Sequence, residues 1–243
     1  MGIKARRYAD ILAGAPEYVT GRQEEWKAFL ATAARNYKYP YYDQLMIYLQ
    51  SPEATACAEY DFWFDAMHRY VKRGAKGIAL VDNEGDSPRL RYVFDVADTG
   101  ARSNSRPVWL WQMKEEYRNP VMAALERAYG VSGENLSLEA QLEQVAGRLA
   151  ADYWMNYGRQ ISGIVADSFL EGYDEFNIGA AFRKAAQASI AYTLSVRCTE
   201  EAENQFEPED FRDVADFNTR QTAAALGTAV SRISREVFRE IER

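Results

Sequence analysis

The spacing of apolar and polar residues predicts two helices near the start of the chain. Apolar positions recur at helical spacing over about 23–36, and Thr20 and Gln23 before them have the spacing of a capping box. A second helix is predicted after Pro40, where apolar side chains follow one another at i, i+3, i+4 and i+7 until Ser51-Pro52. We expect these two helices to pack as an antiparallel pair.

Short segments rich in β-branched and aromatic residues follow, and they predict strands over 77–82, 89–96 and 107–113. Residues 83–88, with the sequence NEGDSP, carry turn-forming side chains, so the first two strands are predicted to form a hairpin. The segment 57–67 is aromatic, and its apolar residues match neither the spacing of a helix nor the alternation of a strand clearly. The first half of the chain therefore has an α+β pattern.

Everything after Asn119-Pro120 has the period of amphipathic helices. The expected fold class is α+β: N-terminal helices with a small antiparallel sheet, followed by a helical bundle without a metal site. The expected domains are 1–115, an α+β domain, and 116–243, a helical domain. The helices expected in the second half cover 120–129, 137–157, 159–171, 178–198, 208–217 and 219–242.

Composition narrows the possible classes of site. The 243 residues include two cysteines far apart and one histidine, His68, so the chain cannot build a zinc site from Cys and His. The apolar stretch near the start is too short for a signal peptide, and no segment approaches the ~20 apolar residues of a membrane span. We expect a cytoplasmic protein that contacts no membrane.

Charge is distributed unevenly along the chain. The formal net charge is −7, but residues 1–115 hold 16 Lys and Arg against 15 Asp and Glu, whereas residues 116–243 hold 13 against 21. An acidic protein does not coat nucleic acid everywhere, but a local basic strip still binds phosphates within a Debye length of ~8–10 Å. The two halves of the chain therefore differ in character.

The strongest basic strip lies in the sequence RYVKRGAKGI, residues 69–78. Long cationic side chains beside glycines suit the phosphates of a nucleic-acid backbone, and a solvated basic turn is the alternative interpretation. Nucleotide-binding motifs of the GxxxxGK[ST] and GxGxxG types are absent, so no nucleotide cofactor is expected. The candidate residues of this loop are Arg69, Lys72, Arg73, Gly74, Lys76 and Gly77.

Aromatic residues lie close to the basic loop in the sequence. Exposed rings beside cations hold single-stranded nucleic acid by stacking combined with backbone charge. We expect one or two of Tyr37, Tyr39 and Tyr60 to be available for stacking. The rings expected to lie mainly in the core are Tyr42, Trp63 and Phe64.

Three runs of residues together resemble a known family. They are NYKYPYYDQLMIYLQSPEAT (36–55), FWFDAMHRYVKRGAKGIALV (62–81) and FDVADT (94–99). In this order they resemble the N-terminal domain of ArdC-like antirestriction proteins, which plasmids, phages and conjugative elements encode. The resemblance covers about residues 20–115 and implies single-stranded-DNA binding.

The resemblance also implies roles for particular residues. Lys72, Arg73 and Lys76 are the expected phosphate ligands, and Gln44 lies in the helix that belongs to the family pattern. The chain has Asp43 and His68 where the family has Asn and Gly, and Asp43 adds a negative charge. In ArdC-like proteins the second half is a zinc-peptidase-like domain with a His-Glu-x-x-His helix, which a chain with one histidine cannot contain.

We therefore expect a non-enzymatic, single-stranded-DNA-binding protein of a mobile genetic element that protects DNA against host defence, with no cofactor and no small-molecule substrate. One alternative partner is a host restriction or CRISPR nuclease, bound through the acidic half, for example by DNA mimicry over 200–216, where eight side chains are acidic. A third possibility is that the chain itself is an accessory domain of a larger helicase or methylase protein.

Two catalytic alternatives have weaker patterns behind them. His68 has no serine or cysteine nucleophile near it in the sequence, which leaves a general base without a partner. Carboxylates on adjacent strands can converge on a hard metal ion in a nuclease, although acidic turns usually serve solubility. The carboxylates of that alternative are Asp82, Glu84, Asp86, Asp95 and Asp98.

Overall fold

The computed structural model describes residues 3–82, 89–130, 136–200 and 202–243. Its helices are α1 (Ile3–Thr20), α2 (Gln23–Arg35), α3 (Tyr41–Gln50), α4 (Glu115–Tyr129), α5 (Leu138–Ser162), α6 (Glu175–Cys198), α7 (Ala202–Gln205) and α8 (Arg220–Ile241). Its strands are β1 (Cys57–Glu59), β2 (Tyr70–Val71), β3 (Ile78–Asp82), β4 (Arg89–Asp95) and β5 (Thr99–Gly100). The π-helical turn η1 (Phe62–Ala66) and the 3₁₀ helices η2 (Val96–Asp98) and η3 (Pro208–Asp216) complete the elements.

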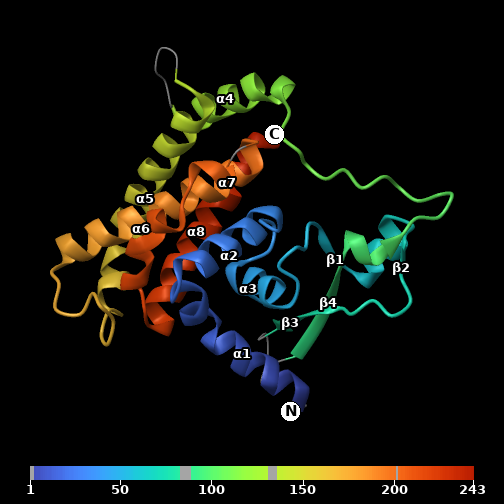
Figure 1. The fold of residues 1–243 in the computed structure, drawn as a ribbon, viewed down its shortest axis with the longest axis horizontal. Helices are drawn as coiled ribbons and strands as arrows, with labels where there is room; N and C mark the ends of the chain where they lie inside the picture. Colours follow the sequence, from blue (N-terminus) through green and yellow to red (C-terminus); the bar gives the residue numbers. More distant parts are fainter. Residues whose placement is uncertain (1–2, 83–88, 131–135, 201) are drawn as a thin grey trace.

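The elements are arranged as a helical body with a small β region on one side (Figure 1). α4 to α8 form the far side of the body, α1 to α3 lie between them and the strands, and β2 is at the outer end of the β region. A segment without regular structure, residues 101–114, runs back from β5 to α4, and we call it the strap. The structure confirms the fold class predicted from the sequence. It is α+β, with helices before and after a small antiparallel sheet in the chain order.

The helical body is built around α6, which is buried on most of its surface. Small residues along α6 let α5, α8 and α2 approach closely, and a helix that is apolar nearly all round belongs in the interior of a fold. The indole Nε1 of Trp26 on α2 donates to the hydroxyl of Ser189 on α6 at 2.9 Å, and both side chains are fully buried. The first helices and the last helices therefore share one core.

This shared core crosses the predicted division between residues 1–115 and 116–243. α1 packs on α8, and α2 packs on both α6 and η3. The β region, in contrast, meets the body mainly through α3 and α1. The division into two domains stays a prediction, whereas the packing identifies the β region with its strap as the part that projects from the body.

Two small antiparallel sheets make up the β region. The first has the strand order β1-β4-β3, with Ile78 opposite Val93, and the second pairs β2 with β5. The predicted hairpin of 77–82 and 89–96 is confirmed by this pairing, while its predicted turn, 83–88, lies outside the described residues. The amide of Gln50 on α3 both donates to the carbonyl of Ala79 (2.8 Å) and accepts from its N–H (2.9 Å), so it pairs an edge of β3 that would otherwise lack partners.

Several local expectations are wrong, each for a physical reason. Thr20 does not cap α2: it is the last residue of α1, and its hydroxyl donates to the carbonyl of Pro16 at 3.1 Å. The expected strand 107–113 has no strand beside it, because residue type alone cannot supply a hydrogen-bonded neighbour. The expected helix 159–171 stops at Ser162, where α5 ends, and continues as turns, one of them with Asp167 at φ 63°.

The other predicted helices match the structure closely, whereas α1 and the short α7 were not predicted. The segment 208–217 does begin at Pro208 but winds as the 3₁₀ helix η3, in which the side chains of Glu207 and Asp210 form a capping box. Phe211 and Val214 of η3 face the core, so its acidic residues point outward or lie at its edges. No helix within the described residues is long and apolar enough to cross a membrane.

Candidate nucleic-acid interface

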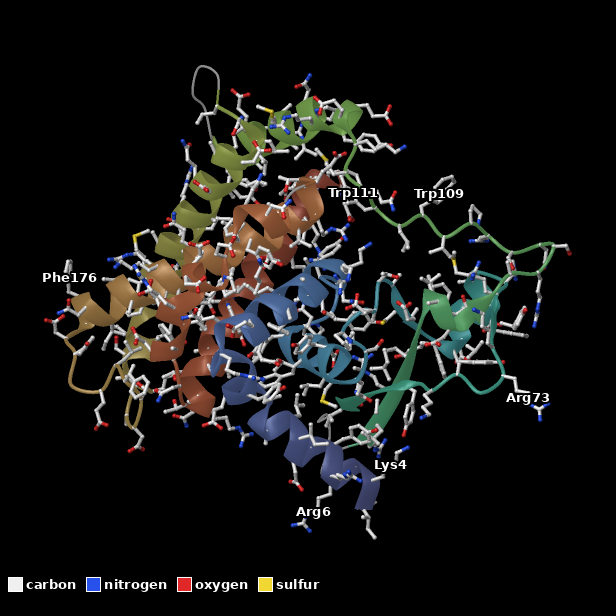
Figure 2. All side chains as sticks on the ribbon, in the orientation of Figure 1. Lys4, Arg6, Arg73, Trp109, Trp111 and Phe176 are labelled. Atoms are coloured by element: carbon white, nitrogen blue, oxygen red, sulfur yellow. The ribbon has the colours of Figure 1, made fainter. Side chains whose placement is uncertain are left out.

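The basic loop is a tight turn at the end of β2. The N–H of Ala75 donates to the carbonyl of Lys72 at 3.1 Å, and Gly74 at the third position of the turn has φ 86°. This geometry is that of a type II turn, which requires a positive φ at that position and therefore favours glycine. Arg73 is consequently held at the tip of the turn, and its side chain points away from the protein (Figure 2).

The second glycine of the loop has a different role. A Cβ on Gly77 would approach the ring of Phe94 to 3.1 Å and the Cβ of Tyr92 to 3.2 Å, so Gly77 is needed for close packing on β4. A Cβ on Gly74 would meet nothing within 4 Å. Gly74 therefore sets the direction of the loop, and Gly77 brings the loop back onto the sheet.

The four cationic side chains of the loop differ in whether they donate hydrogen bonds to the protein. Nε of Arg69 donates to the hydroxyl of Thr99 at 2.8 Å, and Nζ of Lys72 donates to the carbonyl of Ala97 at 2.8 Å. Arg73 and Lys76 are exposed. None of the four forms an ion pair with a carboxylate of the described residues, so their charge is available to an external anion.

The aromatic run before the loop forms the π-helical turn η1. The indole Nε1 of Trp63 donates to the carbonyl of Phe94 at 2.9 Å and the ring is buried, which confirms Trp63 as a core residue. The expectation that Phe64 lies mainly in the core is wrong, because the wider π turn anchors Trp63 on the sheet and leaves Phe64 with an exposed fraction of 40%. Tyr42, also expected in the core, is exposed on the first turn of α3.

Phe64 belongs to a stack of exposed groups beside the loop. Its ring is parallel to that of Tyr60, with centroids 5.9 Å apart and an interplanar angle of 10°. The guanidinium of Arg102 on the strap lies 5.1 Å from the centroid of Phe64 and 5.8 Å from that of Tyr70. We call these four residues, with Lys72, Arg73 and Lys76 of the adjoining loop, the aromatic–basic face.

Tyr70 is fixed in this stack by a glycine on the opposite strand. Tyr70 pairs with Gly100, and a Cβ on Gly100 would lie 2.3 Å from the Tyr70 ring. Only glycine lets the ring lie flat over β5. Sequence reasoning identified Tyr60 but missed Tyr70 and Arg102, and the one available signal was a basic, turn-rich segment, ARSNSR, directly after the Gly100 strand.

Two predicted binding residues lie in the helical core, and their assignment as contacts of a nucleic acid is corrected. Tyr37 is 3% exposed because it packs edge-on against Phe238 of α8, and its hydroxyl donates to Glu242 at 2.5 Å. Gln44 is 1% exposed, and its Nε2 donates to the carbonyl of Asn36. Neither side chain is accessible to a strand.

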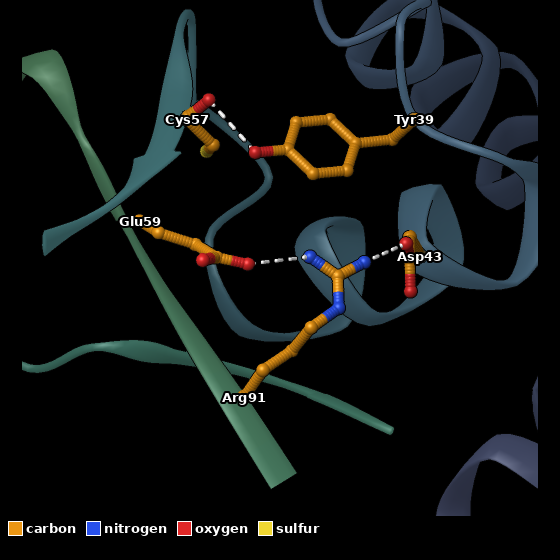
Figure 3. A network of polar contacts seen from close by, with 5 residues as sticks. All are labelled: Tyr39, Asp43, Cys57, Glu59 and Arg91. Atoms are coloured by element: carbon orange, nitrogen blue, oxygen red, sulfur yellow. Dashed lines mark hydrogen bonds and ion pairs between the residues drawn. The ribbon is translucent and has the colours of Figure 1, made fainter. Parts of the chain in front are cut away.

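Tyr39 is half-buried between α3 and β1, in a polar network that also contains Asp43 (Figure 3). Its hydroxyl donates to the carbonyl of Cys57 at 2.8 Å, and burial raises the pKa of that hydroxyl. Arg91 pairs with Asp43 and, at 3.4 Å, with Glu59. Burial raises the pKa of the Asp43 carboxyl, and the Arg91 guanidinium opposes this rise. Because Asp43 is buried and paired with Arg91, its side chain does not add a free negative charge to the surface.

The described carboxylates of the metal alternative do not form a site. Asp95 is buried, and its carboxylate accepts from the backbone N–H groups of Thr55, Ala56 and Ala97, so it links β1 to β4. No group of three or more His, Cys, Asp or Glu among the described residues is placed to hold a metal ion, and Glu84 and Asp86 lie outside them. His68 is half-buried with φ 53°, a conformation that fits the glycine of the family pattern.

Comparison of the chain with protein-family models, with curated proteins and with solved structures finds no match. The resemblance to ArdC-like proteins therefore stays a prediction, and we infer function from the geometry of the aromatic–basic face.

Proposed function

We propose that the protein binds single-stranded DNA through the aromatic–basic face. The observation that carries this proposal is the stack of Tyr60, Phe64, Arg102 and Tyr70 beside a turn whose cations have no carboxylate partner among the described residues. Unpaired bases expose flat faces that stack on such rings, whereas the bases of a duplex are already stacked on one another. The cations then neutralise the phosphates that join the bases.

The chemistry favours a binding protein over an enzyme. The groups of the face supply stacking and positive charge, and neither breaks a phosphodiester bond without a nucleophile, a base or a metal. A non-enzymatic protein of this kind, acting in the cytoplasm on DNA of a mobile genetic element, would shield the strand from host defence nucleases. This role is the one that the resemblance to ArdC-like proteins implies.

The direct experiment is an electrophoretic shift assay with labelled single-stranded and double-stranded DNA of the same length. We expect retention of the single strand and weaker retention of the duplex. The double variant Arg73→Glu/Lys76→Glu should lose the single-strand shift while keeping its thermal unfolding temperature, because both side chains are exposed and make no described ion pair. Equal binding of duplex and single strand would contradict recognition by stacking.

A second candidate function is binding of a basic protein segment, as in inhibition of a host nuclease. The observation that favours it is an acidic end of the helical body, residues 166–177, on which Phe169, Tyr173 and Phe176 are exposed. Exposed aromatic rings among carboxylates are typical of protein interfaces with cationic partners. If Phe176→Ser abolishes protection of DNA in cells while single-strand binding is unchanged, this candidate replaces the first.

A further inference from the structure

A groove lies between the strap and the helical body. It has a volume of about 390 Å³ and is lined by the strap over 109–112 on one side and by 35–39 and 55–57 on the other. Pockets that bind small ligands usually measure about 300–1,000 Å³. The groove is therefore large enough for one nucleotide.

The strap connects the groove to the aromatic–basic face. At its first end the hydroxyl of Ser105 donates to the carbonyl of His68 at 2.7 Å, and the N–H of Arg106 donates to that of Met67 at 3.0 Å. At its second end the indole Nε1 of Trp111 donates to the carbonyl of Arg197 at 2.8 Å. The strap is thus anchored at both ends, and a residue three positions after Arg106 lies within about 10 Å of it, since an extended chain advances at most ~3.6 Å per residue.

That residue is Trp109, whose side chain stands out from the strap with an exposed fraction of 88% (Figure 2). A tryptophan ring that stays in water forgoes the favourable free energy of its burial. A ring this exposed is therefore expected where a binding partner covers it. Trp109 lines the groove together with Lys38 and Tyr39. A nucleobase stacked on its ring would therefore bring its nucleotide to the groove.

The charges and polar atoms of the groove suit a nucleotide. Lys38 is exposed, and its ion pair with Glu242 spans 3.7 Å at the surface, so exchanging this partner for a phosphate costs little. Arg197 adds a second positive charge to the wall, and Glu242, which also lines the groove, pairs with both Lys38 and Arg197, so the three side chains together carry one net positive charge. Asn36 also belongs to the wall, where its Nδ2 donates to two carbonyls and its Oδ1 is buried out of reach of a ligand.

We propose that the groove holds one nucleotide of the bound strand, with its base stacked on Trp109 and its phosphate next to Lys38. This inference rests on the proposed function, and it extends the path of the strand from the aromatic–basic face along the strap. It also gives a binding role to residues 107–113, which the sequence predicted only as a strand.

The test compares three variants in fluorescence-anisotropy titrations with a labelled single strand of about 15 nucleotides, a length within the range that small single-strand-binding domains cover. Trp109→Ala should bind about 5- to 150-fold more weakly, since one base-aromatic stack is lost. Trp109→Phe should bind nearly as well as the unaltered protein, because a flat ring remains. Phe176→Ala is the matched control: its ring is 75% exposed at the opposite end of the molecule, and its loss should leave binding unchanged.

The outcomes separate the two proposals. If the unaltered protein binds the strand and Trp109→Ala binds it equally well, the groove is not part of the path and this inference is wrong, while the proposed function stands. If the unaltered protein does not bind the strand, both are wrong. Quenching of tryptophan fluorescence by free deoxyadenosine monophosphate, combined with unaltered strand binding by Trp109→Ala, would assign the groove to free nucleotide and also overturn the inference.

Discussion

Replacing Phe64 by leucine separates the stacking role of this ring from its role in packing. Phe64 belongs to the aromatic–basic face, where its exposed ring is parallel to that of Tyr60 and contacts the guanidinium of Arg102. Leucine keeps an apolar side chain over the sheet but has no flat face. The substitution therefore removes one stacking surface for a base and one partner of Arg102.

The structure sets the size of both effects. One base-aromatic stack contributes about 1–3 kcal/mol, so binding of a single strand should weaken about 5- to 150-fold. Because the Phe64 side chain is already 40% exposed, and apolar exchanges of similar volume cost less than about 1.5 kcal/mol even in cores, the free energy of unfolding should fall by less than that amount.

The assay is a titration of labelled oligodeoxythymidylate at low salt, followed by urea unfolding of the same samples. Phe176→Leu provides the control, since it makes the same exchange at an exposed ring on the other end of the molecule. Weakened binding with near-native stability for Phe64→Leu alone is the expected result. If Phe64→Leu binds the strand as tightly as the unaltered protein, the ring does not stack on bases and the reasoning is refuted.

Three further predictions concern the fold that holds the site. Gly74→Ala should destabilise the protein by about 1–2 kcal/mol in urea unfolding, because φ 86° is unfavourable for a residue with a Cβ, and an unchanged midpoint would argue against the type II turn. Burial raises the pKa of both thiols, Cys57 and Cys198, to about 12, so iodoacetamide at pH 8 should alkylate them only after unfolding; rapid alkylation of the native protein would contradict this. Trp26→Phe removes the hydrogen bond to Ser189 and should lower the stability of the whole molecule by about 1–3 kcal/mol in a single transition, whereas two separate transitions would show that the first and last helices do not share one core.

Much of the fold could be predicted because its signals are local. The hairpin of β3 and β4 follows from two β-rich segments around a turn-forming sequence, and α3 follows from apolar spacing between two prolines. The exposure of Arg73 and Lys76 also follows locally, since charged side chains at a glycine-containing turn remain in solvent. These features need no knowledge of the rest of the chain.

The errors arise where contacts are distant in the sequence. Tyr37 is buried because the end of α8, some 200 residues later, covers it, and no pattern around Tyr37 indicates this. Similarly, Arg102 reaches the face only because β5 pairs with β2 and places the start of the strap over Phe64. Phe64 was misplaced for a third reason: an aromatic run of three residues fits helix and strand equally well, and a π-helical turn fits neither period.

The measurement that tests the central claim most directly is the salt dependence of single-strand binding. If the turn of β2 holds phosphates, neutralising Arg73 and Lys76 in Arg73→Gln/Lys76→Gln should make the slope of log K against log salt shallower by about 1.4, at about 0.7 for each phosphate contact on a single strand. Arg6→Gln/Arg7→Gln removes the same charge from an exposed part of α1, and its slope should equal that of the unaltered protein. An equal slope for all three proteins, or no binding by the unaltered protein at low salt, would contradict the account.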